Sequence, residues 1–455
     1  MTAPSDAVPP GESTAAAPAT GRSLRQRVLA ASVWTVGGQI ADRVLHLGSN
    51  LVLTRLLFPE AFGVMAMVNA VVQGLGLISD VGIGPSIIRD KRGLEPGFLN
   101  TAWTIQVVRG FALWAIAALL AWPLSRQFGE PSLAALIPAA AVNAAIAGFN
   151  AVNMHTWRRR LELWRVTTIE LAASVVSVIA TIALALAWRS VWALALGSIA
   201  GALVKLVWSH AWSHHAHRLH WDPDVARSMY RFGRWIFLST FFTWLTNQGD
   251  RLLMGNLLSL ADLGQYAIAT LMLKSLVQAI TMLANRVLFP MYSEIGQETT
   301  PQLERYVTRI RTMVTFGVLP PLWLLAVAGD QVVAVLYDAR YQDAGWMLQI
   351  LAAGSIFRFL SWIGPLNLAR GESFIGLLAT GPHGAALLAG IWIGHAVAGT
   401  FGTVVGIGAS YFVYYPVQVW LSRRYGVWSA AQDLLAIGLS TLAVLGGLAL
   451  RGSFG

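Results

Sequence analysis

The chain of 455 residues contains no cysteine, and only 12% of its residues are charged. The absence of cysteine excludes disulfide bonds and thiolate metal sites. A soluble chain carries about 25% charged residues, so this share is too small to cover a globular surface of this size. Hydrophobic residues make up 56% of the sequence, and the mean hydropathy is +0.58. These proportions predict an all-α integral membrane protein that crosses the bilayer many times.

The first 22 residues, "MTAPSDAVPPGESTAAAPATGR", contain no apolar core. A secretory signal peptide needs an apolar run of about 7–15 residues. We therefore expect residues 1–22 to form a disordered cytoplasmic tail.

Thirteen largely apolar runs follow, each long enough to cross about 30 Å of hydrocarbon as a helix. An odd number of spans places the C-terminus on the side opposite to the N-terminus. The last span could instead lack a partner, or the count could be off by one, so we expect 12–14 spans. The predicted spans are residues 28–53, 62–86, 101–122, 132–153, 166–188, 190–209, 232–257, 263–289, 309–329, 345–368, 373–395, 398–421 and 432–450.

Basic residues are concentrated in every second connection: one set of connections holds 20 and the other set only 5. By the positive-inside rule the first set, which includes the N-terminus, is cytoplasmic. The net charge of +10 is then a topology signal beside anionic lipid headgroups, and it does not indicate nucleic-acid binding. All connections are short, the longest outward one being about residues 330–344. They leave no room for an extramembrane catalytic domain, so we expect no enzyme activity and no catalytic residues.

The passage "SNLVLTRLLFPEAFGVMAM" at 49–67 recurs as "DRLLMGNLLSLADLGQYAI" at 250–268, a shift of 201 residues. Leu57 falls on Leu258, and Gly63 falls on Gly264. The shift corresponds to six spans, an even number, so both copies cross the membrane in the same direction. We therefore predict two parallel-repeat six-helix lobes around a central cavity, plus at least one C-terminal helix. The predicted parts are an N-terminal lobe 23–209, a cytoplasmic linker 210–231, a C-terminal lobe 232–421 and an extra helix 422–455.

Several charged residues fall inside the predicted spans, and a charge at mid-helix costs about 2.5–3.5 kcal/mol on insertion scales. Lys205, Arg286, Asp80 and Glu170 lie near cytoplasmic span ends, where snorkelling or salt bridges explain them. The others lie deeper and predict an aqueous cavity whose positive lining suits an anionic cargo, such as a diphosphate or an acidic sugar. The predicted substrate-binding residues are Asp42, Arg43, Arg109, Asp250, Arg251, Lys274 and Arg358.

Five histidines lie in the cytoplasmic stretch "SHAWSHHAHRLHW" at 209–221. Clustered imidazoles can bind a metal, but no carboxylate or thiolate accompanies them. We therefore expect a loop at headgroup level and no metal site.

Several stretches resemble the polysaccharide transporter family, the oligosaccharide flippases of the multidrug/oligosaccharidyl-lipid/polysaccharide exporter superfamily. They include "LTRLLFPEAFGVMAM", "SDVGIGPSIIR", "LNTAW", "DRLLMGNLLSLADLGQYAIA", "NRVLFPMYSEI" and "FRFLSWIGPLNLARGE". The resemblance implies a flippase that translocates a polyprenyl-diphosphate-linked oligosaccharide across the inner membrane by alternating access, for surface polysaccharide export. It implies no cofactor, and coupling to an H⁺ or Na⁺ gradient in at least some relatives. On this resemblance, Asp42 and Asp250 would hold the arginines in place or take up protons. The implied partners are a lipid-linked anionic glycan, membrane lipids and the polysaccharide polymerase and export machinery. No nucleic acid is implied.

Other functions stay open from the sequence. A multidrug exporter or a peptidoglycan-precursor flippase of the same superfamily would share the fold. A membrane glycosyltransferase or polymerase would need a catalytic group on a substantial loop, and a structural scaffold would leave the interior charges unexplained.

Overall fold

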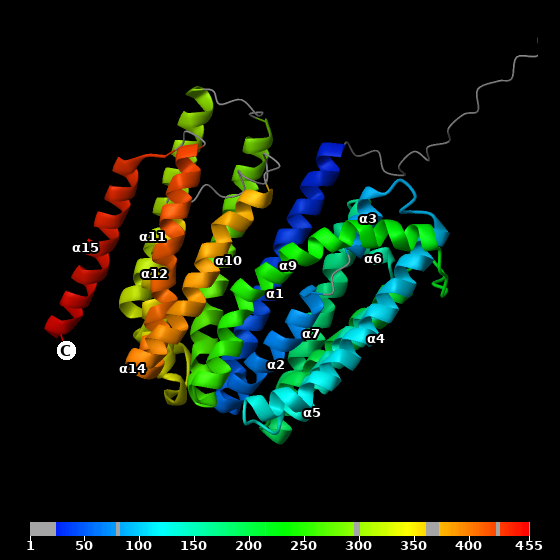
Figure 1. The fold of residues 1–455 in the computed structure, drawn as a ribbon, viewed down its shortest axis with the longest axis horizontal. Helices are drawn as coiled ribbons and strands as arrows, with labels where there is room; N and C mark the ends of the chain where they lie inside the picture. Colours follow the sequence, from blue (N-terminus) through cyan, green and yellow to red (C-terminus); the bar gives the residue numbers. More distant parts are fainter. Residues whose placement is uncertain are drawn as a thin grey trace, which may run out of the picture.

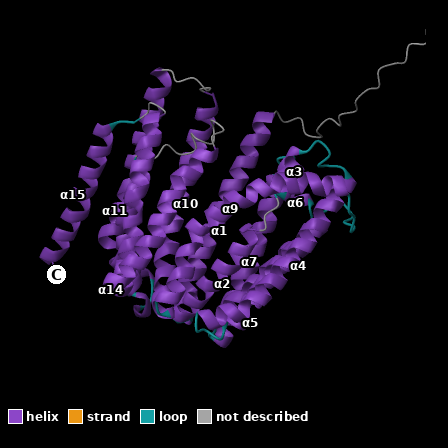
Figure 2. Cartoon of the chain, viewed as in Figure 1, coloured by secondary structure: helices purple, strands orange, loops and turns teal. Residues whose placement is uncertain are grey.

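The computed structural model describes residues 24–78, 82–213, 215–294, 301–360, 373–424 and 428–454. These residues form helices and connecting loops without a strand (Figure 2). The helices of the first half are α1 (Leu24–Leu56), α2 (Pro59–Ile78), α3 (Ile83–Arg89), α4 (Pro96–Gln127), α5 (Leu133–Gly148), α6 (Asn153–Arg159), α7 (Leu163–Trp188) and α8 (Trp192–Ala211). Those of the second half are α9 (Pro223–Leu257), α10 (Leu260–Glu294), α11 (Pro301–Leu336), the 3₁₀ turn η1 (Ala339–Tyr341), α12 (Asp343–Phe359), α14 (Ser373–Arg424) and α15 (Ala430–Phe454).

The all-α membrane fold is confirmed, and each of the thirteen predicted spans overlaps a helix. By length and composition alone, seven described helices qualify as spans, or eight if the bent pair α5 and α6 counts as one. The amphipathic α1 and α9 fall outside this group because their polar side chains lower the mean hydropathy. In Figure 1, α15 starts near the edge where α1 starts and runs toward the opposite edge, as expected for an odd number of crossings.

One predicted span, 132–153, is broken in the structure. The pair α5 and α6 bends by 62° between Gly148 and Asn153. At the break, the backbone N–H of Ala151 donates to Ser209 Oγ at 3.1 Å, and that of Val152 donates to His217 Nε2 at 3.1 Å. These side chains satisfy backbone donors that a continuous helix would satisfy internally, so the chain can turn there. Similarly, the range 62–86 divides into α2 and α3.

Three other boundaries differ from the prediction. The C-terminal lobe's first helix, α9, begins at Pro223 because Asp222 caps it and accepts from the N–H groups of Asp224 and Val225. At its other end, α11 extends to Leu336, which reduces the predicted outward connection of 330–344 to residues 337–342. The ranges 373–395 and 398–421 are the two arms of α14, which reverses direction at Ala398 and Gly399. Gly399 adopts a φ of 57°, which glycine tolerates without strain.

The packing of helices repeats between the two halves. In the N-terminal half α1 packs on α7, α4 on α5, and α2 on α5. Their six-span equivalents pack likewise: α9 on α14, α11 on α12, and α10 on α12. The two halves meet where α2 contacts α9 and α10, and α15 lies against α11 (Figure 1). This arrangement confirms the predicted pair of parallel lobes.

The repeated passage forms a contact between the lobes. The corner between α1 and α2 packs against the corner between α9 and α10. A Cβ at Gly63 would meet the carbonyl oxygen of Leu260, and a Cβ at Gly264 would meet that of Pro59. In the shift of 201, Gly63 is equivalent to Gly264 and Pro59 is equivalent to Leu260, so the two contacts are the same contact made in each direction. The two copies of the passage therefore touch each other across the lobe interface, and glycine in each copy allows the backbones to approach.

Candidate functional site

A cavity of about 1200 Å³ lies between the lobes. Helices α1, α7 and α8 supply one wall, and α10 and α11 supply the other. Its polar lining comes mainly from the N-terminal lobe, and the opposite wall contributes leucines, Pro321, Ser275 and Gln278. A cavity with walls from both lobes is the place where relative movement of the lobes would change access.

One face of α1 provides the cavity's polar stripe, because Gln39, Asp42, Arg43 and His46 follow helical spacing. Asp42 accepts a hydrogen bond from Ser174 of α7, with Oγ at 2.6 Å from Oδ1. Its Oδ1 also lies 3.6 Å from His46 Nε2. The carboxylate is therefore positioned by two helices and by a neighbour on its own helix.

The charge of the inter-lobe cavity is balanced, which differs from the predicted positive lining. Arg43 and Lys205 are its basic residues, and Asp42 and Glu170 are its acidic ones among the described lining residues, with His46 beside them. The folded chain distributes the charges of the predicted spans over separate cavities. Of the seven predicted residues, Asp42 and Arg43 line the inter-lobe cavity.

Three predicted residues, Asp250, Lys274 and Arg358, line a smaller cavity of about 220 Å³ inside the C-terminal lobe. Asp250 is only 5% exposed and accepts a hydrogen bond from Tyr266, with Oη at 2.6 Å from Oδ2. His383 lines the same cavity. Among the described lining residues of this cavity, Lys274 and Arg358 are basic and Asp250 is the carboxylate.

The other two predicted residues lie elsewhere. Arg251 donates from Nη1 to Gln248 Oε1 at 2.9 Å, and Gln248 Nε2 donates to Gln73 Oε1 of α2 at 2.8 Å. This chain of bonds connects α9 to α2 across the lobe interface. Arg109 lines a third cavity in the N-terminal lobe and donates from Nη2 to the carbonyl of Gly76 at 2.7 Å. The structure thus brings Asp42 together with Arg43, and Asp250 together with Lys274 and Arg358. The transport role predicted for these seven residues stays a prediction.

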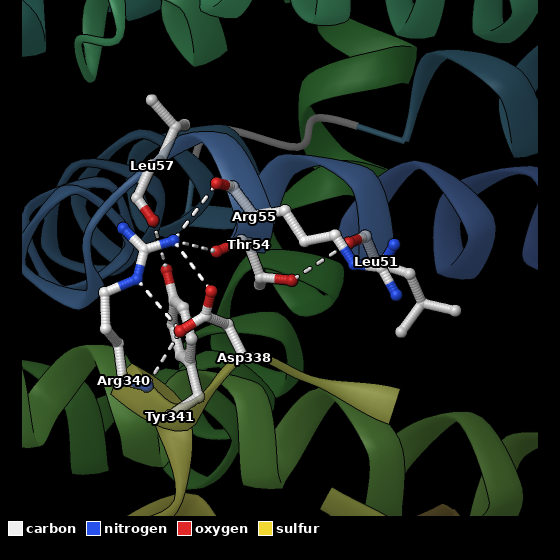
Figure 3. A network of polar contacts seen from close by, with 7 residues as sticks. All are labelled: Leu51, Thr54, Arg55, Leu57, Asp338, Arg340 and Tyr341. Atoms are coloured by element: carbon white, nitrogen blue, oxygen red, sulfur yellow. Dashed lines mark hydrogen bonds and ion pairs between the residues drawn. The ribbon is translucent and has the colours of Figure 1, made fainter. Parts of the chain in front are cut away.

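Sequence reasoning missed an inter-lobe network at the far end of α1, shown in Figure 3. Arg340 Nη2 donates to the backbone carbonyls of Thr54 at 3.2 Å and Arg55 at 3.0 Å. Tyr341, fully buried, donates from Oη to the carbonyl of Leu57 at 2.9 Å. These bonds close the lobes together on the predicted outward side. Sequence reasoning counted Arg340 only as a loop charge because the carbonyls that it contacts leave no signal in the sequence.

Asp338 orients this network. Its carboxylate lies 3.1 Å from Arg340 Nε. The hydrogen bond from the Arg340 backbone N–H, together with that from the Arg340 side chain, lowers the pKa of Asp338. The carboxylate therefore stays ionised and holds the guanidinium toward α1.

The linker between α8 and α9 is held against the N-terminal lobe by hydrogen bonds to α4. Side chains of Asn100, Thr104 and Thr101 on α4 accept the backbone N–H groups of the linker. The bonds join Arg218 to Asn100 at 3.2 Å, His220 to Thr104 at 3.0 Å and Asp222 to Thr101 at 3.1 Å. The "LNTAW" stretch therefore has a structural use as the docking face for the linker.

The linker histidines pack together and bind the lobe. His215 Nε2 lies 2.9 Å from Asn100 Oδ1, and His210 Nε2 lies 2.7 Å from the carbonyl of Phe149. The ring of His217 contacts those of His210 and His215, with centroids 4.9 and 5.2 Å apart. Burial, followed by the charges of His210 and His215, lowers the pKa of His217 to about 4. Within the described residues, which exclude His214, no group of three potential ligands is placed to hold a metal.

The two lobes, the repeated packing and the polar cavity between them define the fold of a two-lobed helical membrane transporter. A solved structure of the lipid II flippase MurJ, in an inward closed conformation, superposes with a TM-score of 0.70 at 10% identity and covers 92% of this chain and 98% of MurJ. An inward-facing multidrug resistance transporter of the MATE family gives a TM-score of 0.59 at 16% identity, covering 86% and 96%. These likenesses establish the fold.

The chain belongs to the polysaccharide biosynthesis protein family, whose sequence model matches residues 52–345. The lipopolysaccharide biosynthesis protein WzxC of Escherichia coli (strain K12) is 22% identical over 387 residues, which cover 84% of this chain and 78% of WzxC. The succinoglycan biosynthesis transport protein ExoT of Rhizobium meliloti (strain 1021) is 23% identical over 324 residues, which cover 70% of this chain and 64% of ExoT. The predicted resemblance is thereby confirmed, and the chain is a multi-pass membrane protein.

Proposed function

We propose that this protein is a flippase that moves a polyprenyl-diphosphate-linked oligosaccharide across the inner membrane by alternating access, for surface polysaccharide export. The observation that carries the proposal is the inter-lobe cavity of about 1200 Å³, walled by both lobes and lined by ionisable side chains that belong to predicted spans. Such groups are expensive in hydrocarbon and mark transport pathways. Family membership supports a polysaccharide cargo.

The names of the relatives refer to polysaccharide biosynthesis and, for ExoT, to transport, which favours this function over a multidrug exporter. The charge of the inter-lobe cavity does not separate the two, because its lining is balanced. A peptidoglycan-precursor flippase shares the diphosphate chemistry, and the MurJ likeness extends only to the fold. The connections between the described helices are short, which agrees with a transport protein that carries out no catalysis of its own.

The proposal places the N-terminus in the cytoplasm, because the basic connections gather on its side. It makes Asp42 and Asp250 the candidates for coupling to an H⁺ or Na⁺ gradient, since each is a carboxylate in a cavity. A polysaccharide polymerase with its export machinery is the proposed downstream partner.

The test follows the sidedness of lipid-linked glycans in cells depleted of this protein. Accumulation on the cytoplasmic leaflet, reversed by the wild-type chain, is the expected result. Arg43→Gln should fail to reverse it, because Arg43 lies in the inter-lobe cavity. Arg189→Gln removes an exposed arginine beyond the end of α7 and should behave as wild type. Unchanged sidedness in depleted cells, with normal surface polysaccharide, would contradict the proposal and favour the small-molecule exporter.

A further inference from the structure

The N-terminal lobe contains its own cavity, of about 520 Å³, between α2, α3, α4, α5, α6 and α8. Among the described residues it shares one lining residue with the inter-lobe cavity, Lys205. Its volume lies within the roughly 300–1,000 Å³ of typical small-ligand sites. The break between α5 and α6 forms part of its wall, through Gly148, Asn150 and Ala151.

The lining of this N-lobe cavity is basic. Arg109 of α4, Arg158 of α6 and Lys205 of α8 reach it from three helices, and its described lining residues include no carboxylate. Gln106 also lines it, and its Nε2 donates to the carbonyls of Ala147 at 3.1 Å, and of Gly148 and Asn150 at 3.0 Å each. The carbonyl oxygens exposed by the helix break are therefore covered, and the groups that face the cavity are predominantly donors.

A single carboxylate, Glu170 of α7, stands beside two of these bases. Its Oε1 lies 2.9 Å from Arg158 Nη2 and 3.6 Å from Lys205 Nζ. Glu170 itself lines the inter-lobe cavity. The side chains of Arg158, Glu170 and Lys205 remain 33–42% exposed, so the cluster is accessible. One oxygen atom thus holds two basic groups at the boundary between the two cavities.

We propose that the N-lobe cavity is a binding site for a phosphate or diphosphate group, and that Glu170 occupies the place of this anion beside Arg158 and Lys205 when the site is empty. A diphosphate offers several oxygens to the guanidinium and ammonium donors, which a single carboxylate cannot match. Its binding releases Lys205 from Glu170. The inference rests on the proposed function, because the anion is the diphosphate of the lipid-linked cargo. The cargo is taken up on the side of α3 and α6 before it enters between the lobes.

The first experiment measures binding of inorganic pyrophosphate to the purified full-length chain in phosphatidylcholine nanodiscs. The wild-type chain should bind it, and Lys205→Gln should weaken binding by about ten- to a hundredfold, the effect expected for one charged hydrogen bond. Glu170→Gln should tighten binding, because the competing carboxylate is gone. Arg189→Gln, which replaces an exposed arginine beyond the end of α7, should bind as wild type. A misfolded variant does not gain affinity, so the opposite signs separate site effects from folding effects.

The site is refuted if the wild-type chain does not bind pyrophosphate, or if Glu170→Gln and Lys205→Gln both bind with wild-type affinity. It is equally refuted if Arg189→Gln weakens binding as much as Lys205→Gln. Competition identifies the source of the anion: polyprenyl diphosphate in the nanodisc should displace pyrophosphate. Displacement by phosphatidylglycerol alone would contradict the cargo as source. Glycan flipping with no pyrophosphate site would leave the proposed function standing, and a confirmed site without flipping would overturn the function alone.

Discussion

At the scale of single residues, the lobe interface depends on two glycines at positions where no side chain fits. Gly63 and Gly264 occupy equivalent places in the two copies of the repeat, and each receives a backbone carbonyl of the other copy. The carbonyls belong to backbone that cannot move aside as a flexible side chain could. A methyl group at either position therefore has to push the corners of the lobes apart.

We expect Gly264→Ala to lower the stability of the folded chain by about 1–3 kcal/mol, the range for added methyl groups in closely packed sites. Gly48→Ala is the matched control, since a Cβ there meets nothing within 4 Å on the exposed face of α1. That change should stabilise the chain by about 0.5–1 kcal/mol through its helix propensity. Thermal unfolding in detergent measures both; equal unfolding temperatures for the two variants would contradict the close contact.

At the scale of elements, the linker between α8 and α9 is a docked segment whose attachment requires neutral histidine. Val152 donates its backbone N–H to His217 Nε2, and a protonated ring has no acceptor to offer. His217 also faces His210 and His215, which would repel its positive charge. The docked linker therefore binds fewer protons than a released one at mildly acidic pH.

This imbalance gives a pH dependence with a defined sign. The pKa of His217 is lowered from its usual 6.5 to about 4, so docking has its full strength above pH 6.5 and weakens progressively as the pH falls toward 4. Hydrogen exchange at the amides of Arg218, His220 and Asp222, corrected for intrinsic rates, should show protection at pH 7 that declines by pH 5. His217→Gln should abolish this pH step, while His220→Gln, which replaces an exposed ring, should retain it. A pH step unchanged in His217→Gln would assign it to another group.

The elements also show which features of the fold are readable from sequence. Apolar length located all thirteen predicted spans, because hydrocarbon thickness dictates a minimum run. The break before α6 was not readable, because Ser209 and His217, from distant parts of the chain, satisfy its backbone donors. The predicted span 309–329 ends beside the non-helical Ala328, after which α11 resumes and runs to Leu336. Local composition specifies where a helix can exist, and tertiary partners specify where it stops.

At the scale of the whole molecule, the site was only partly predictable. The depth of Asp42 and Arg43 in a span correctly indicated that polar groups would line a cavity. Depth alone could not assign Asp250, Lys274 and Arg358 to a separate cavity inside one lobe, because that requires knowing which face of each helix meets which neighbour. The contacts of Arg340 and Tyr341 were equally hidden, since they involve carbonyls that every residue possesses.

Those contacts identify the part of the interface that has to separate if the lobes alternate. Arg340 and Tyr341 join the α11–α12 connection to the end of α1 through a few hydrogen bonds to carbonyls (Figure 3). A net hydrogen bond is worth about 0.5–1.5 kcal/mol, which thermal motion and cargo binding can overcome. A covalent link at the same place cannot open, so it should stop transport.

Because the chain has no cysteine, a pair introduced by substitution can be cross-linked without background. Arg55→Cys combined with Arg340→Cys, bridged by a short bismaleimide, should lose glycan flipping on cross-linking and retain it when unlinked. The control pair, Asp262→Cys with Thr400→Cys, replaces side chains 3.1 Å apart within the C-terminal lobe, and its cross-link should leave flipping intact. Loss in both pairs would point to damage inside a lobe, and loss in neither would mean that these lobes do not separate at Arg340 during transport. Loss in the first pair alone would require the lobes to move as two bodies, as the repeated packing within each lobe implies.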